Sequence, residues 1–577
     1  MIARLTASRF AVLYRTFVAQ FFASESATSD HAVRQAIIGI LAFLVVPGFL
    51  LPLQMDAQFG IVARHYPALL DPLVRLVATI FITYSIVSIG VVAAFAWDAL
   101  GFDRRDAMVL GPLPVSGATV IAAKLAALAA LLLGASVVVA LITAFSFSMV
   151  ASDSGGFLAM SRHFAAHVIA TLTASTFAFG VLVTLRALVG MVGGGRVAVA
   201  SVVQFALVSA LLCFIVLVPT AFTITTHRGH VTVFMQPIPW WSPTNWFVRL
   251  YETARGSNVA EFRPAAMTAL ALTLIAVAAA ILATIASYRR QLQLALTPTA
   301  SARTHGLARL LAAISRALAG RHPVARATSD FVLTTMLRSR AQQAPVAINA
   351  AVAVAVAAAA FSRAGGDREA LSHPRTIVLW IPLLLAYWTI VGLRAAFHVP
   401  SELPASWTFR ANAPAVSRAC WSGTRVAMTA LVAPPAALLA AAVTVPLFGW
   451  RIGVWHTAFV LLLVAALVEL VALTLDALPF ARPYRPGHAK LKTRWPLYLL
   501  GMYAFAVWPV RMELLSFGGA EPRLLAYVLA AIVALHLAGL AAGARWSVDP
   551  REEAADDLGD VSVLDIGGVV HGAHIGG

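Results

Sequence analysis

Long apolar runs separated by short polar segments recur along this chain from Ala36 to Ala544. A helix that crosses the hydrocarbon core of a bilayer needs roughly 20 apolar residues, and windows of about 19 residues locate such runs. In the first half the candidate spans are 34–53, 73–97, 119–149, 163–187, 197–222 and 264–287; in the second half they are 344–361, 374–397, 421–448, 453–478, 496–517 and 523–545. We therefore predict an all-α polytopic membrane protein with about 12 transmembrane helices, or eleven if the short, Ala-rich run 344–361 does not span.

One long polar stretch, residues 289–345, divides the predicted spans into two six-helix halves. Within it, leucine and isoleucine recur at helical spacing from Leu307 to Leu318, which is typical of an amphipathic helix on a charged surface. The predicted organisation is a first transmembrane half with an N-terminal interfacial helix, a basic linker with amphipathic helices, a second transmembrane half and an acidic, Gly-rich tail that we expect to be disordered: 1–288, 289–345, 346–547 and 548–577.

The order of elements indicates an internal repeat. At an offset of 301 residues Ser116 aligns with Ser417 and Lys124 with Arg425, each pair standing at the end of a polar loop that leads into the third span of its half. Both halves read as an interfacial helix, two spans, a polar loop and four spans. A chance match of Ala- and Leu-rich segments is the alternative, and the shared order of elements favours the repeat.

Composition and charge narrow the function classes. The chain is 60% hydrophobic and only 12% charged, which excludes a soluble globular enzyme, since soluble proteins carry about 25% charged residues. The net charge of +17 comes from Lys and Arg spread over many short loops and not from one basic face, so we expect no nucleic-acid partner. The two cysteines, Cys213 and Cys420, are too few for a disulfide framework or a Cys-rich metal site.

The loop cations predict the orientation. Placing both termini and the linker in the cytoplasm puts most Lys and Arg on the inside, as expected for a multi-pass protein of the plasma (inner) membrane. The loop 223–263 counts against this assignment because it carries four arginines on the proposed outside, although Glu252 and Glu261 accompany them.

The most distinctive polar segment, Trp97 to Ser116, joins the second and third spans. It places four charged residues directly before apolar ones, and we predict a short surface helix from about Arg104 to Leu110, ended by Gly111 and Pro112. Charged side chains can orient such a helix and apolar ones can anchor it in the groove of a partner. A solvated loop is the alternative.

This segment resembles the coupling segment of type-2 ABC exporter permeases. In that family polar residues precede a Leu-Pro-x-Ser motif and an Ala-Lys-Leu motif follows, here Leu113-Pro114-Val115-Ser116 and Ala123-Lys124-Leu125. The segment Ile238 to Glu252 is similar to the Pro-rich, Trp- and Phe-containing extracytoplasmic segment before the last span, although its aromatic residues also suit a membrane interface. The second half departs from the pattern: Phe409 to Ser417 keeps the final serine but not the acids.

The resemblance implies a membrane-spanning permease subunit, in contact with membrane lipid, whose ATPase subunit is a separate chain that binds the ATP. The transported substrate stays unknown. The residues implied in coupling to the ATPase are Phe102, Asp103, Arg104, Arg105, Asp106, Met108, Leu110 and Ser116, with Arg410 and Ser417 as a weaker set in the second half. The chain itself has no phosphate-binding loop, because none of its three lysines follows a glycine, so we expect neither enzymatic activity nor a cofactor. Its histidines show no metal-ligand spacing.

Two acids inside the predicted spans are the other candidates for function. Glu469 and Asp476 stand seven residues apart, about two helical turns, and so share one face of a span. An ion- or proton-coupled secondary transporter would use such a pair as a relay. We favour a structural role, with Glu469 satisfied by a neighbouring arginine or hydroxyl.

Three functions remain in order of preference. The ABC exporter permease comes first, and a twelve-span secondary transporter of the major facilitator type comes second. The loop motif of the second class, Gly-x-x-x-Asp-Arg-x-Gly-Arg-Arg, is absent, since Ala99 and Asp106 occupy its glycine positions. An intramembrane enzyme acting on lipids comes last, with Glu469 and Asp476 as its only carboxylates.

Overall fold

The computed structural model is helical and describes most of the chain. The described residues are 8–22, 69–97, 99–102, 104–110, 112–152, 155–192, 197–220, 222–227, 230–235, 241–257, 259–296, 306–363, 376–399, 401, 417–475, 478–480, 495–516 and 522–543. The predicted span 34–53, the tail 548–577 and the loop before Ser417 lie outside them.

Helices coincide with every predicted span from residue 73 onward, so the prediction of an all-α polytopic membrane protein is confirmed. The helices of the first half are α1 (Arg9–Phe22), α3 (Leu70–Phe95), α4 (Arg104–Leu110), α5 (Gly117–Ala151), α6 (Gly156–Val192), α7 (Val197–Thr220), α8 (Pro243–Ala254) and α9 (Phe262–Leu296). Those of the linker and second half are α10 (Gly306–Leu318), α11 (Pro323–Arg338), α12 (Arg340–Arg363), α13 (Thr376–Ala396), α15 (Ser417–Phe448), α16 (Trp450–Ala472), α17 (Trp495–Met502), the π-helical turn η5 (Tyr503–Val507), α18 (Trp508–Ser516) and α19 (Pro522–Gly543). Within the described ranges, 8 helices are long and apolar enough to cross a membrane. The total number of spans stays a prediction.

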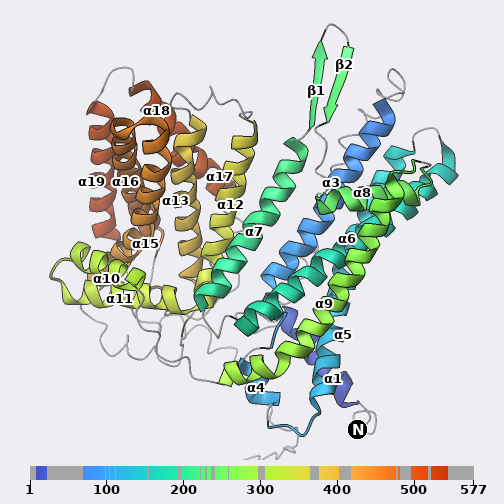
Figure 1. Ribbon diagram of the computed structural model, residues 1–577. Helices are drawn as coiled ribbons and strands as arrows, with labels where there is room; N and C mark the ends of the chain where they lie inside the picture. Colours follow the sequence, from blue (N-terminus) through green and yellow to red (C-terminus); the bar gives the residue numbers. More distant parts are fainter. Residues whose placement is uncertain are drawn as a thin grey trace, which may run out of the picture.

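The two ends of the helix bundle differ in what covers them (Figure 1). Helices α1 and α4 lie at one end, where α10 and α11 run across the ends of the long helices; we name this the α4 end. The strands and α8 lie toward the other, which we name the hairpin end. The short helix predicted from Arg104 to Leu110 and the amphipathic helix predicted around Leu310 are both present, as α4 and α10.

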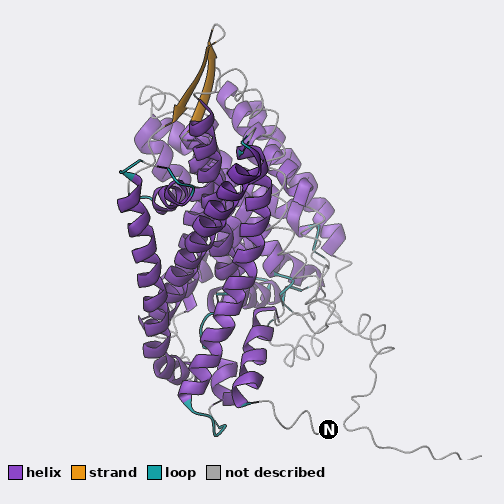
Figure 2. Ribbon diagram, turned by 90° about the vertical axis from the view of Figure 1, so that its right-hand side faces the viewer, coloured by secondary structure: helices purple, strands orange, loops and turns teal. Residues whose placement is uncertain are grey.

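A two-stranded antiparallel hairpin follows α7. Strand β1 (Phe222–His227) pairs with β2 (His230–Met235), with Phe222 opposite Met235 and His227 opposite His230. Figures 1 and 2 show that it extends beyond the helices. The hairpin was not predicted from the sequence, although β-branched residues recur in both segments: threonine and isoleucine in the first, valine and threonine in the second.

The same helix pairs pack in both halves. The interfacial helix lies against the third span in each half, α1 on α5 and α11 on α15, and the third span lies against the fourth, α5 on α6 and α15 on α16. Helices α3 and α13 each contact the fourth span of their half, and the two halves meet where α7 packs on α12. This shared set of contacts agrees with an internal repeat.

Close helix approach in the second half depends on a glycine. A Cβ atom at Gly423 of α15 would lie 2.5 Å from the carbonyl oxygen of Ala325 and 2.7 Å from the Cβ of Thr328, both in α11. Small residues let helix backbones approach closely in membrane proteins, where van der Waals packing is a main source of association. Gly423 therefore lets α11 pack directly on the third span.

Candidate functional site

A fully buried lysine lies beside the predicted coupling segment. Lys124 is two turns into α5, and its Nζ lies 4.6 Å from the centroid of the Phe17 ring and 5.6 Å from that of Phe102. The same Nζ lies 4.0 Å from Oδ2 of Asp106, which is also buried. A buried charge is tolerated when it is paired, and aromatic faces add cation–π attraction. Lys124 thus holds α4 and α1 against the third span.

Hydrogen bonds fix the chain on both sides of α4. Before it, the backbone N–H of Phe102 donates to Oε1 of Gln291 in α9 at 3.0 Å. After it, Nη1 of Arg9 in α1 donates to the carbonyl oxygen of Pro114 at 2.9 Å. The hydroxyl of Ser116 then accepts from the backbone N–H of Thr119 at 3.2 Å and caps α5. Motion of α4 would therefore be felt by α1, α5 and α9.

The outer side of this segment carries large apolar side chains. Met108 is 53% exposed and Val109 is 58% exposed on α4, and Leu113, after the helix, is 47% exposed. We name these three residues the α4 face. Clustered exposed apolar side chains at the end of a membrane protein indicate a contact surface for another molecule.

The sequence-predicted coupling residues thus divide into two groups. Met108 points outward, while Phe102 and Asp106 face inward and position the helix. We expected from the sequence that Asp106 orients a partner; instead it faces Lys124, because a buried ammonium needs a counter-ion. Leu110 is partly buried against Phe17 and Phe102, and Ser116 is the helix cap.

Several predicted residues are beyond what the structure describes. Asp103 and Arg410 lie outside the described residues. Arg104 and Arg105 belong to α4, and Ser417 begins α15, but their side chains are not described.

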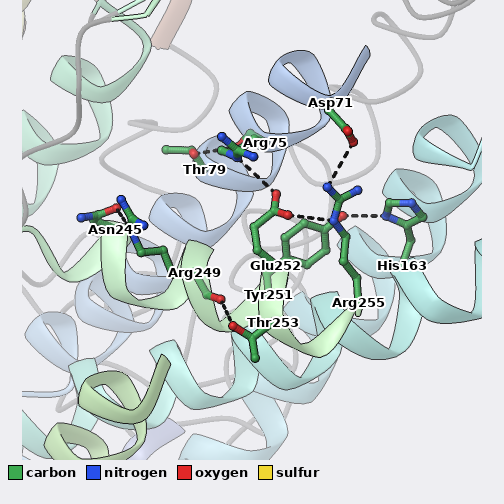
Figure 3. Close-up of polar contacts among 10 residues, drawn as sticks. All are labelled: Asp71, Arg75, Thr79, His163, Asn245, Arg249, Tyr251, Glu252, Thr253 and Arg255. Atoms are coloured by element: carbon green, nitrogen blue, oxygen red, sulfur yellow. Dashed lines mark hydrogen bonds and ion pairs between the residues drawn. The ribbon is translucent and has the colours of Figure 1, made fainter. Parts of the chain in front are cut away.

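A second polar cluster occupies the hairpin end (Figure 3). Glu252 of α8 is fully buried, and its two oxygens accept from Nε of Arg75 at 3.3 Å and from Nε of Arg255 at 2.8 Å. Nη2 of Arg255 also donates to Oδ1 of Asp71 at 3.1 Å. The carboxylate is compensated by two guanidinium groups, so the cluster anchors α8 to α3.

The neighbouring residue Tyr251 ties α8 to α6. Its hydroxyl lies 2.6 Å from Nδ1 of His163. Burial raises the pKa of Tyr251 far above its usual value, so the phenol stays protonated. Tyr251 and Phe247 are fully buried inside the protein, which corrects the expectation that they lie at a membrane interface; Trp241, by contrast, is 62% exposed. The reason is that α8 packs against α3, α6 and α9.

Charged side chains inside the second half are also paired. Glu469 of α16 is buried and forms an ion pair with Nη2 of Arg425 in α15, and Nδ1 of His536 in α19 lies 3.2 Å from Oε1 of Glu469. The guanidinium of Arg425 also lies 4.5 Å from the centroid of the Trp421 ring. The arginine partner considered for Glu469 from the sequence is present, and Asp476 lies outside the described residues.

A further buried pair escaped the sequence analysis. Nδ1 of His456 lies 2.9 Å from Oε2 of Glu513, and both side chains are fully buried. The two residues stand 57 positions apart, so no local motif could signal the contact.

Metal ligation finds no support in the described part of the chain, where no group of three or more His, Cys, Asp or Glu residues converges. The α4 face is an outward apolar surface that no described part of the chain covers. Comparison with protein-family models, curated proteins and solved structures finds no match, so the functional argument rests on the geometry of these sites.

Proposed function

We propose that this chain is the permease subunit of an ABC exporter, driven by separate ATPase subunits that dock on the α4 end. One observation carries the proposal: α4 is a short helix clamped to α1, α5 and α9 on its inner side while Met108 and Val109 stay exposed on its outer side. Such a helix offers an anchor to a partner and a rigid connection to the spans.

The sequence supplies the second part of the argument. A chain without a phosphate-binding loop must receive its energy from elsewhere, and an ATPase subunit can act only from the cytoplasm. Helix α4 connects directly to α3 and α5, so a force applied there enters two spans at once.

The paired state of Glu469 bears on the ion-coupled alternative. A buried carboxylate is tolerated when a cation pairs with it, and Arg425 is such a partner for Glu469. The ion pair with Arg425 therefore supports the structural role of Glu469 and favours the exporter over the secondary transporter.

The test is purification of the native complex from membranes, with identification of any co-purifying protein that carries a phosphate-binding loop. Replacing Met108 and Val109 by Asp should remove that ATPase from the preparation, because two charges would enter an apolar contact. Reversing charge at Arg104 and Arg105 with Glu should weaken recovery as well.

The chain offers a matched control. Phe157 and Leu158 are also adjacent, exposed and apolar, but they lie in the first turn of α6 at the hairpin end, and replacing both by Asp should leave recovery of the ATPase unchanged. Purification of the unaltered protein without an ATPase, or full recovery with the Met108/Val109 variant, would remove the proposal.

A further inference from the structure

Trp97 stands between the two halves of the protein. It follows the last turn of α3, in the connector that leads to α4, and its side chain is fully buried. The guanidinium of Arg186 in α6 lies 5.9 Å from the centroid of its ring, and that of Arg340 lies 5.8 Å from it. Arg340 is the first residue of α12, so one aromatic ring is shared by a cation of the first half and a cation at the start of the helix that leads into the second half.

Hydrogen bonds link the same residues to the helix ends. Nε of Arg186 donates to the carbonyl oxygen of Trp97 at 2.9 Å. Nη2 of Arg340 donates to Oε1 of Gln204 in α7 at 3.4 Å, and Nε2 of Gln204 donates to the carbonyl oxygen of Ala94 in α3 at 2.8 Å. The end of α3 is therefore connected to α12 by two routes, one through the indole ring and one through Gln204.

The connector itself leaves little room for independent motion. A Cβ atom at Gly101 would lie 2.8 Å from Nη2 of Arg186, so the backbone between Trp97 and α4 lies directly beneath that guanidinium. One residue further on, Phe102 is held by Gln291. Any displacement of α4 must consequently move the Trp97 contact or break it.

We propose that Arg340 and Trp97 transmit the movement of α4 to the second half, so that an ATPase docked on the α4 face acts on both halves of the chain. The inference rests on the proposed function. It assigns Arg340 and Trp97 as positioning residues: they touch neither partner nor substrate, and they join the coupling segment to α12. A cation–π contact suits this task, because in a desolvated site it holds the cation to the ring face without requiring one fixed hydrogen-bond angle.

The experiment measures amide hydrogen exchange in the purified complex with its ATPase, with and without a non-hydrolysable ATP analogue. In the unaltered complex the analogue should change the exchange rates at α4 and at the start of α12 by at least threefold. In Arg340→Gln the response at α4 should persist and the response at α12 should fall below the level of detection. Trp97→Phe, which keeps an aromatic face, should retain the α12 response, and Trp97→Leu, which leaves only the route through Gln204, should reduce it.

The matched control is Arg338→Gln, an exposed arginine in the last turn of α11 and only two residues from Arg340. Its response to the analogue should equal that of the unaltered complex. An undiminished α12 response in Arg340→Gln would overturn the inference.

A second measurement needs no partner. In the chain alone, a double-mutant cycle with Trp97→Leu and Arg340→Gln should show a coupling of at least threefold in the unfolding equilibrium, which measures the contact itself. Strict additivity of the two changes would overturn the inference even if an ATPase docks on α4. The native complex could also contain no ATPase while the double-mutant cycle still shows coupling. That result would refute the proposed function and the transmission role, but the contact between Trp97 and Arg340 would be established.

Discussion

The substitution Lys124→Met should release α4 from the third span. The change removes an ammonium that is fully buried and lies 4.0 Å from Asp106. Methionine fills the same space with an apolar side chain of similar length. At that separation and an effective dielectric constant of about 20, the Coulomb attraction is about 4 kcal/mol. Removing one partner of a buried pair costs about 3–5 kcal/mol, because the other charge stays buried without compensation. A loss of about 3 kcal/mol corresponds to roughly a 150-fold shift toward the released state.

The consequence can be measured at Ala107, which is only 2% exposed in α4. In a protein otherwise free of cysteine, Ala107→Cys should react slowly with a maleimide reagent, and adding Lys124→Met should raise the labelling rate by about a hundredfold as α4 opens locally. Ala436→Cys, at a buried position of α15, is the control and should label at the same rate in both backgrounds.

The double variant tests directly whether the ion pair holds α4. Lys124→Met combined with Asp106→Asn leaves no unpaired charge, so most of the protection at Ala107 should return. If the double variant labels as fast as Lys124→Met alone, or if Lys124→Met does not raise the rate, the buried pair does not hold α4 and the reasoning fails.

Three further predictions follow from other parts of the structure. Glu469→Gln leaves Arg425 without its counter-ion, so the melting temperature should fall, and adding Arg425→Gln should restore part of it. Equal melting temperatures for Glu469→Gln and the unaltered protein would contradict the structural role of the ion pair. Gly423→Val should cost about 1–3 kcal/mol of stability, because it overpacks the contact between α15 and α11. Gly134→Val should not, since a Cβ at Gly134 meets nothing within 4 Å. Similar denaturation curves for the two variants would refute close packing at Gly423. The orientation predicted from the loop cations implies that a cysteine introduced at Ser301 is protected from an impermeant reagent in intact cells, and labelling there would reverse that orientation.

The sequence was sufficient to locate the long apolar helices that the structure describes, because the length of an apolar run is itself the physical requirement for crossing a bilayer. It also placed α4, since Gly111 and Pro112 end the helical pattern after Leu110. It could not reveal that Asp106 faces inward, because that depends on a lysine that reaches it only once α5 packs beside α4. The pairs Glu469–Arg425 and His456–Glu513 join residues 44 and 57 positions apart, and nothing local connects them.

The lengths of the helices have a mechanical consequence. Helices α5 and α9 have 35 residues each, so at 1.5 Å per residue they are about 52 Å long, whereas α13, with 21 residues, is about 32 Å long. Against a hydrocarbon core of about 30 Å, and even with a typical tilt of about 20°, the long helices extend well outside the lipid while α13 hardly does. A given rotation therefore moves the ends of a long helix further: a rotation of about 10° about the midpoint of α5 displaces its ends by about 4–5 Å, compared with about 3 Å for α13. Equal rotations of a long and a short helix would therefore produce unequal displacements outside the lipid.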